Sequence, residues 1–121
     1  DGRTLYVSEN AGGAVLKYDV VERKVVARSA VGSQARTIAL SHDERILYAA
    51  SSEDGRIVAL RAGDLSHLYD APFVAPMGVA VSPDDRRVWV TSYTGAGYVT
   101  VFDAIADGGE QVPQAKVVPG S

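Results

Sequence analysis

The 121-residue chain contains no cysteine, which excludes disulfides, thiol catalysis, zinc–cysteine sites and iron–sulfur clusters. It has no apolar run near the roughly 18 residues that a membrane helix needs, and its first residues do not show the pattern of a signal peptide. Positive charge is also scarce, because 12 Lys and Arg face 15 Asp and Glu and give a net charge of −3. This balance argues against a nucleic-acid binder, which would carry a basic patch or stripe.

The composition that remains is that of an ordinary globular domain, with 46% hydrophobic and 22% charged residues. The length suits one domain and not two. The chain starts at Asp1 in what reads as the middle of a structural unit, and it ends at Ser121 as another unit begins. We therefore expect a segment of a longer protein or a processed product.

A repeat of 41 to 42 residues runs through the chain. One block has an acid, a turn residue and an arginine before an alternating strand, at residues 1–8 (DGRTLYVS), 43–50 (DERILYAA) and 84–91 (DDRRVWVT). A second block starts with glycine, at residues 13–19 (GAVLKYD), 55–61 (GRIVALR) and 97–103 (GYVTVFD). A third block pairs residues 36–41 (RTIALS) with residues 77–82 (MGVAVS). Agreement at so many positions with one spacing indicates an internal repeat.

Each repeat unit holds four short β runs, which in the second unit are residues 37–40, 46–50, 56–60 and 67–69. No run keeps helical spacing over more than ten residues. Four strands in about 40 residues are typical of a β-propeller blade. We predict an all-β protein of about three blades, each a four-stranded antiparallel sheet, belonging to a larger or oligomer-completed propeller. The expected blades are residues 1–35 (lacking the first strand), 36–76 and 77–118, with 119–121 entering the next blade.

The residues between the β runs have the chemistry of turns. Residues 82–85 (SPDD) predict a tight turn in which the Asp84 side chain accepts backbone hydrogen bonds. Asp19 and Asp103 end the third strand of their units, and each side chain is expected to bond the backbone two residues further along the chain. Three glycines before the third strand predict a positive φ or close packing; they are Gly13, Gly55 and Gly97.

These blocks resemble the YVTN family of β-propeller repeats. The resemblance rests on residues 82–84 (SPD), 88–92 (VWVTS) and 99–103 (VTVFD), and again on 5–10 (LYVSEN) and 15–19 (VLKYD). The second unit departs most, because His42, Glu44 and Arg61 replace the usual proline, glycine and aspartate. WD40 repeats fit less well, since the chain has neither a Gly-His nor a Trp-Asp dipeptide, and kelch repeats have a period near 50.

The resemblance implies several functions. Such repeats occur in bacterial and archaeal surface or secreted proteins, and similar propellers form the heavy subunit of periplasmic amine dehydrogenases and a family of sugar-lactone hydrolases. We expect a non-catalytic binding or scaffold module of an extracytoplasmic bacterial protein, periplasmic or secreted, with no cofactor of its own. One alternative is a propeller segment of a redox enzyme whose cofactor lies in another chain, and a second is a lactonase-like hydrolase. The fold alone does not choose among these.

The expected partners follow from the number of blades. Propellers close at about four to eight blades, so three blades leave two exposed flanks. We expect the remaining blades, from the same chain or another copy, to cover them, and a strand from elsewhere to complete the first blade. A protein partner fits the binding role; no nucleic acid and no membrane span are expected.

The candidate site residues lie on the face formed by the loops after the second strands and by the links between blades. They are Arg36, Glu9, Asn10, Glu53, Asp54 and Tyr93. Arg36, at the start of a strand nearest the central channel, would attract an anion or pair with a neighbouring acid. Adjacent carboxylates such as Glu53 and Asp54 suit calcium but are more often solvated turn residues. We predict no metal site and no catalytic residue.

Aromatic residues and histidines complete the predictions. Tyr6, Tyr48 and Trp89 share one position of the repeat and are expected to pack between blades rather than bind a ligand. His42 is expected in a surface turn and His67 on an exposed outer strand, too far apart for a metal site or a catalytic pair.

Overall fold

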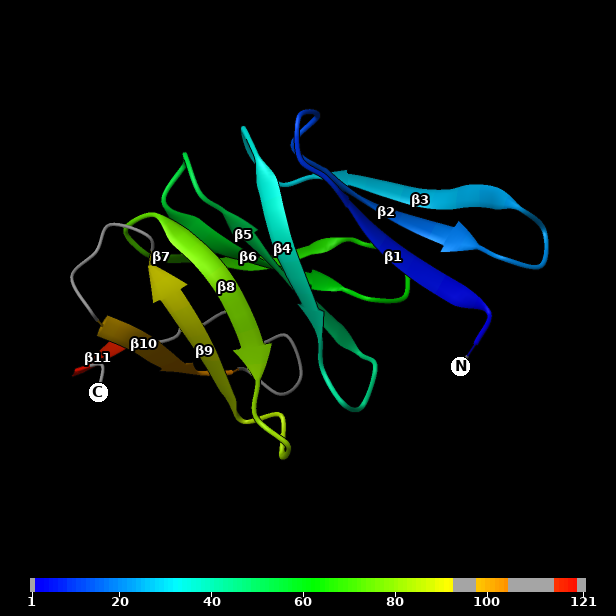
Figure 1. Cartoon of the computed structure of the whole chain (residues 1–121). Coiled ribbons are helices and arrows are strands. Elements are labelled where there is room, and N and C mark those ends of the chain that lie inside the picture. The colour runs from blue at the N-terminus through cyan, green and yellow to red at the C-terminus, as the bar shows by residue number, and fades with distance from the viewer. Residues whose placement is uncertain (1, 93–97, 105–114, 120–121) are drawn as a thin grey trace.

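The computed structural model describes residues 2–92, 98–104 and 115–119 of the chain, and within them it contains eleven strands and no helix (Figure 1). The strands are β1 (Thr4–Glu9), β2 (Ala14–Asp19), β3 (Lys24–Ala30), β4 (Ala35–Leu40), β5 (Ile46–Ser51), β6 (Arg56–Arg61), β7 (His67–Pro72), β8 (Pro76–Val81), β9 (Arg87–Ser92), β10 (Tyr98–Asp103) and β11 (Ala115–Pro119).

The described strands form three antiparallel sheets that follow one another along the chain. Their strand orders are β1-β2-β3, β4-β5-β6-β7 and β8-β9-β10-β11. The predicted all-β propeller fold class is therefore confirmed. The four strands predicted for the second unit are also confirmed, although the outermost one continues to Pro72 rather than ending at Tyr69.

The repeat extends to irregularities of the backbone. The pairing of β2 with β3 shifts between Lys17 and Tyr18, and the pairing of β6 with β7 shifts at the equivalent place, between Ala59 and Leu60. The pairings of β4 with β5 and of β8 with β9 also shift at equivalent places. Both places lie near the start of β4 and of β8, which stand first in their sheets and are called the inner strands below. A shift of this kind bends a strand and increases its twist, so the sheets share a shape as well as a sequence pattern.

The turn between the first two strands is held by side-chain oxygens, as predicted. In the third sheet, Arg86 N–H donates to Asp84 Oδ1 at 3.0 Å, and Ser82 Oγ–H donates to the same oxygen at 2.7 Å. In the second sheet, Arg45 N–H donates to Asp43 Oδ1 at 3.1 Å, and the Ser41 hydroxyl donates to the same oxygen at 2.6 Å. The predicted role of Asp19 is confirmed too, because Val21 N–H donates to its Oδ1 at 2.9 Å.

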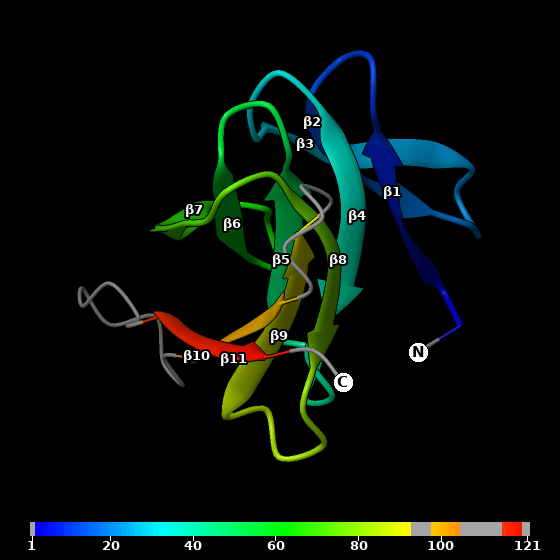
Figure 2. The same ribbon diagram turned by 60° about the vertical axis from the view of Figure 1, so that its left-hand side comes forward.

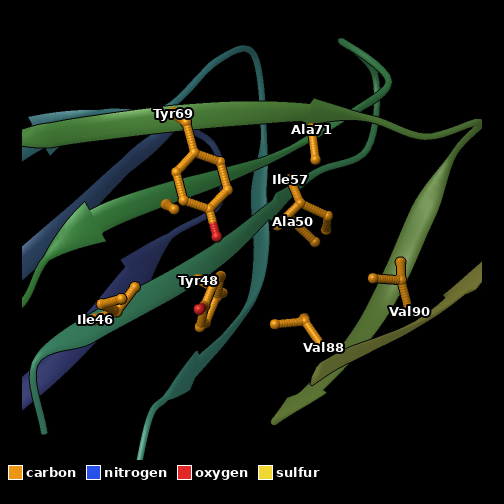
Figure 3. Packing of buried hydrophobic residues seen from close by; sticks show 9 residues of the cluster. Ile46, Tyr48, Ala50, Ile57, Tyr69, Ala71, Val88 and Val90 are labelled. Atoms are coloured by element: carbon orange, nitrogen blue, oxygen red, sulfur yellow. The ribbon is translucent and has the colours of Figure 1, made fainter. Parts of the chain in front are cut away.

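The hydrophobic core lies between successive sheets. Leu47, Ala49, Val58 and Leu60 of the second sheet face the first sheet and are buried. On the opposite face, Tyr48 packs in one cluster with Val88 and Val90 of the third sheet, and Figure 3 shows these side chains between the two sheets. Alternation along each strand thus gives the middle sheet two buried faces, which is why β5 is buried along its whole length.

The two outer faces are open, and this corrects one prediction. Trp89 is 39% exposed, whereas its equivalent Tyr48 is 1% exposed. Trp89 therefore does not pack between blades in this chain, because its face of the third sheet has no described sheet against it. Leu5 is likewise 52% exposed, whereas its equivalent Leu47 is 1% exposed. The tyrosine of the first sheet, Tyr6, is half-buried and donates its hydroxyl to Ala62 O at 2.9 Å.

Candidate functional site

The candidate site is the end of the molecule at which the β1–β2 and β5–β6 loops meet the links between sheets. Figure 1 shows these loops at the same end, towards the top of the view. The links are residues 31–34, between β3 and β4, and 73–75, between β7 and β8. Loops held by a rigid scaffold are where binding residues concentrate in such folds.

The backbones of the first loop and the first link are in close contact. Gly13 has the predicted positive φ, at 61°, and a Cβ added there would lie 1.8 Å from the carbonyl oxygen of Gly32. Val31, which precedes Gly32, also takes part in this contact, because its N–H donates to Gly13 O at 2.8 Å. The prediction for Gly55 is confirmed by its φ of 67°, whereas Gly97 lies outside the described residues.

Asp54 holds the second loop to the same link. Ser33 donates to it twice, from its N–H at 2.8 Å and from its hydroxyl at 2.9 Å, and the Ser51 hydroxyl donates at 3.0 Å. The N–H of Ser33, followed by the two hydroxyls, holds the pKa of Asp54 below its ordinary value. Asp54 is therefore a carboxylate engaged by three donors that joins two loops. The sequence carried one signal of this, a serine three residues before an aspartate.

The other candidates are spread along this end of the molecule. Glu9 ends β1 and forms an ion pair with Arg28 of β3, at 3.6 Å. Asn10 follows in the loop, where its carbonyl accepts the N–H of Gly13 at 3.2 Å. Both side chains are exposed.

The remaining candidates belong to the second and third sheets. Arg36 is the second residue of β4 and is exposed, and Glu53 is exposed in the β5–β6 loop. Tyr93 lies outside the described residues. The structure thus brings Asp54 into contact with the link between β3 and β4, and it places Arg36 in β4.

Serine hydroxyls connect the second and third sheets at this end. Ser52 donates to Pro76 O at 2.6 Å, and Ser92 donates to Val74 O at 2.8 Å. Thr37 of β4 donates its hydroxyl to Met77 O of β8, which joins the two inner strands directly. These residues were not singled out from the sequence, because their partners lie 18 to 40 positions away.

A charged cluster on the outer strands of the second sheet was also missed. Arg56 donates to Asp70 at 2.7 Å and to Val31 O at 3.2 Å, and His67 Nε2 lies 2.6 Å from Asp70 Oδ1. The cluster ties β6 and β7 to the link of the preceding sheet. His67 is exposed on the outermost strand of its sheet, as predicted, and His42 is exposed in its turn, as predicted.

Two features are absent from the described part of the chain. Among residues 2–92, 98–104 and 115–119, no three His, Asp or Glu side chains are grouped so that they could hold a metal ion. In the same part of the chain, no helix has the length and apolar character needed to cross a membrane. What these residues do form is a set of loops fixed to one another by hydrogen bonds, with Glu9, Asn10, Arg36 and Glu53 exposed on them.

The sheets and their arrangement are those of β-propeller blades, and solved structures agree. The chain is 26% identical to a dihydro-heme d1 dehydrogenase, NirN, solved with DHE, over 98% of this chain and 26% of that one, with a TM-score of 0.78. It is 25% identical to the hydrazine synthase of Kuenenia stuttgartiensis, over 86% of this chain and 30% of that one, with a TM-score of 0.79. A periplasmic gluconolactonase of Pseudomonas aeruginosa is 22% identical over all of this chain and 38% of that one, with a TM-score of 0.85.

These neighbours are β-propeller proteins, so the chain is similar to part of a propeller. It spans about a quarter to two-fifths of the length of each of the three. No protein-family model matches the sequence, and no curated protein matches it.

Proposed function

We propose that the chain is part of a YVTN-type propeller ring that serves as a non-catalytic binding and scaffold module in an extracytoplasmic bacterial protein. The observation that carries this proposal is the set of hydrogen bonds that polar side chains form at the loop end. Ser33 joins the β3–β4 link to Asp54 of the β5–β6 loop, and Ser51 donates to Asp54 within the same hairpin. Ser52 joins the β5–β6 loop to the first residue of β8. Such loops are rigid, and rigid loops present exposed side chains to a partner with little loss of entropy.

The repeat supports the ring. Leu5 and Val7 occupy the positions of Leu47 and Ala49, which the first sheet buries, yet Leu5 and Val7 are exposed. An apolar sheet face of this kind is an interaction surface. We infer that another blade covers it, as the first sheet covers the second, and that a further blade covers Trp89. Extracytoplasmic location rests on the repeat type and on the likeness to a periplasmic protein.

A second candidate function is a propeller segment of a redox enzyme whose cofactor is carried elsewhere. The likeness to NirN favours it, because the identity extends over 98% of this chain and that structure was solved with DHE. A lactonase-like role is less well supported, because Asp54, one of three carboxylates at the loop end, is already engaged by serine donors.

The proposal is tested by light scattering coupled to size exclusion, together with an absorption spectrum and an assay of lactone hydrolysis. We expect a mass of two or three times 12.8 kDa at high concentration, as copies cover each other's flanks. Leu5→Asp should return the mass to 12.8 kDa, whereas Val21→Asp, in an exposed turn away from that face, should not.

A monomer at every concentration would overturn closure of the ring by copies of this chain, and the remaining blades would then have to come from further residues of the same protein. A visible absorption band that copurifies with the chain would favour the redox candidate over a cofactor-free module. Hydrolysis of glucono-δ-lactone that Asp54→Asn abolishes would favour the lactonase and overturn the non-catalytic role.

A further inference from the structure

The hairpin formed by β2 and β3 carries exposed apolar side chains at its turn. Val21, in the turn, is 67% exposed, and Val25 and Val26 at the start of β3 are exposed by about half. These three residues are called the valine tip below. Figure 1 and Figure 2 both show the turn at the edge of the molecule, away from the second and third sheets. Apolar side chains gathered at such a place mark an interaction surface.

The second sheet shows that a neighbouring blade would not cover this tip, because the first sheet already stands against the second. The repeat aligns Val21 with Gly63, and the residue before each one donates its N–H to an equivalent arginine carbonyl. A Cβ added at Gly63 would meet nothing within 4 Å. Val25 aligns with His67, because each pairs with an equivalent residue of the neighbouring strand, and His67 is exposed. The positions of the valine tip thus stay open beside another sheet.

The same hairpin differs from its equivalent in charge. Arg23, Lys24 and Arg28 stand where the second sheet has a leucine, a serine and an aspartate. Residues 2–30 contain five cations and three acids, although the whole chain is net negative. The acid within the turn, Glu22, pairs with Lys24 at 3.4 Å, and both side chains are exposed. Exposed pairs of this kind are weak, so the cations of the hairpin are able to bind another anion.

The turn holds the valine tip in one shape. The N–H groups of Val21 and Glu22 donate to Asp19 Oδ1 at 2.9 and 3.0 Å, and the N–H of Arg23 donates to Asp19 O at 2.8 Å. The N–H of Glu22, more than any other group, holds the pKa of Asp19 below its ordinary value. A turn ordered in this way loses little entropy when it binds.

A projecting tip of valines beside three cations has the chemistry that binds an anionic lipid surface. Apolar side chains enter the boundary between headgroups and acyl chains, and cations are attracted to the lipid phosphates. Addition of a peptide strand to β3 is less favoured. The pairing of β2 with β3 shifts beside Tyr18, and a bulge of this kind, with Lys24 on the strand, is how proteins protect an edge from pairing.

We propose that the β2–β3 hairpin binds the surface of an anionic lipid bilayer, with the valine tip inserted among the headgroups and Arg23, Lys24 and Arg28 against the phosphates. The chain then lies on the membrane surface and does not cross it. Binding does not require the ring, because Val21 is exposed in the single chain and its position stays open beside a neighbouring blade.

The first test is sedimentation of the whole chain with vesicles of phosphatidylcholine, alone or mixed with phosphatidylglycerol in equal parts. We expect binding to the mixed vesicles only, weakening as salt is raised. Val21→Asp should weaken it about tenfold, and Arg23→Gln about fivefold, the effect of one cation at an anionic surface. The matched control is Val74→Asp at the loop end, where an equally apolar side chain is 75% exposed; binding should stay within about twofold.

A fluorescent label tests insertion directly. Because the chain has no cysteine, Val21→Cys and Val74→Cys each take a single environment-sensitive label. With mixed vesicles, we expect the label at position 21 to brighten and shift to the blue, and the label at position 74 to stay unchanged. An unchanged label at position 21, or equal weakening by Val21→Asp and Val74→Asp, would overturn the assignment to the valine tip.

Two further outcomes would overturn the proposal as a whole. The first is a wild-type chain that does not sediment with the mixed vesicles. The second is binding of a soluble peptide of alternating Glu and Leu that depends on Val21 while vesicles do not bind, which would assign the tip to a protein partner. The ring is decided separately, because Val21→Asp should leave the mass in light scattering unchanged.

Discussion

The equivalent leucines Leu5 and Leu47 allow the repeat to be tested by one pair of substitutions. Both stand at the second position of their strands, β1 and β5, with the same neighbours in the sequence pattern. Leu47 is 1% exposed and Leu5 is 52% exposed. Because intrinsic strand preference is the same for both, Leu47→Ala and Leu5→Ala differ only in what covers the side chain.

The expected costs follow from burial. Replacing a buried leucine by alanine removes about 2.4 kcal/mol of transfer free energy at about 0.8 kcal/mol per carbon. The cavity left behind raises the loss for Leu47→Ala to about 3–4 kcal/mol. Leu5 has only about half of its surface to lose and leaves no enclosed cavity, so Leu5→Ala should cost about 1 kcal/mol. At roughly 4 °C per kcal/mol for a domain of this size, the melting temperatures should differ by about 10 °C.

The assay is urea denaturation followed by far-UV circular dichroism, at a concentration where light scattering gives 12.8 kDa. The midpoint should shift much more for Leu47→Ala, with m unchanged in both variants. Equal losses would refute the claim that the face of Leu5 is open in the single chain. A loss for Leu5→Ala that grows with protein concentration would show that copies cover this face.

Two further predictions concern the loop end. Gly13→Ala should destabilise the chain by more than about 1 kcal/mol, because the backbone at Gly13 is left-handed and the added Cβ would meet Gly32 O. Gly63→Ala is the control: nothing lies within 4 Å of its Cβ, so this substitution should shift the unfolding midpoint little. The depressed pKa of Asp54 contributes stability that is present above the unfolded value of about 3.9 and is lost as pH falls through the lower folded value. Melting temperatures of the wild type should therefore fall more steeply than those of Asp54→Asn below pH 4, and parallel curves would contradict the role of Asp54.

The fold could be predicted because its signals are local. The Asp84 turn, the glycine before each third strand and the alternation of β5 depend on neighbours within a few residues, and each recurs at a fixed spacing. A signal that occurs three times in one chain can be recognised from that chain alone. The propeller class followed from the number of strands in each unit.

The site was less predictable because its contacts are long-range. Asp54 was recognised as a polar loop residue, but its donor Ser33 lies 21 positions away in another loop. Asp85 and His42 lie 43 positions apart and meet only because successive sheets stack. The burial of Trp89 was wrongly predicted for a related reason: its position in the repeat is buried only where a following sheet is present, and the sequence pattern does not contain that condition.

The units differ at positions that affect how neighbouring sheets are joined. Where the units agree, as at Ser41 and Ser82, the residues build the same turn in each sheet. Where they differ, the joint changes: His42 gives Asp85 a backbone donor, whereas Pro83 has none to give to an acid in a following unit. In the proposed ring, a joint after the third sheet would therefore lack the donor that His42 gives in the joint before it. The two flanks of the chain would then differ in the neighbour that they accept.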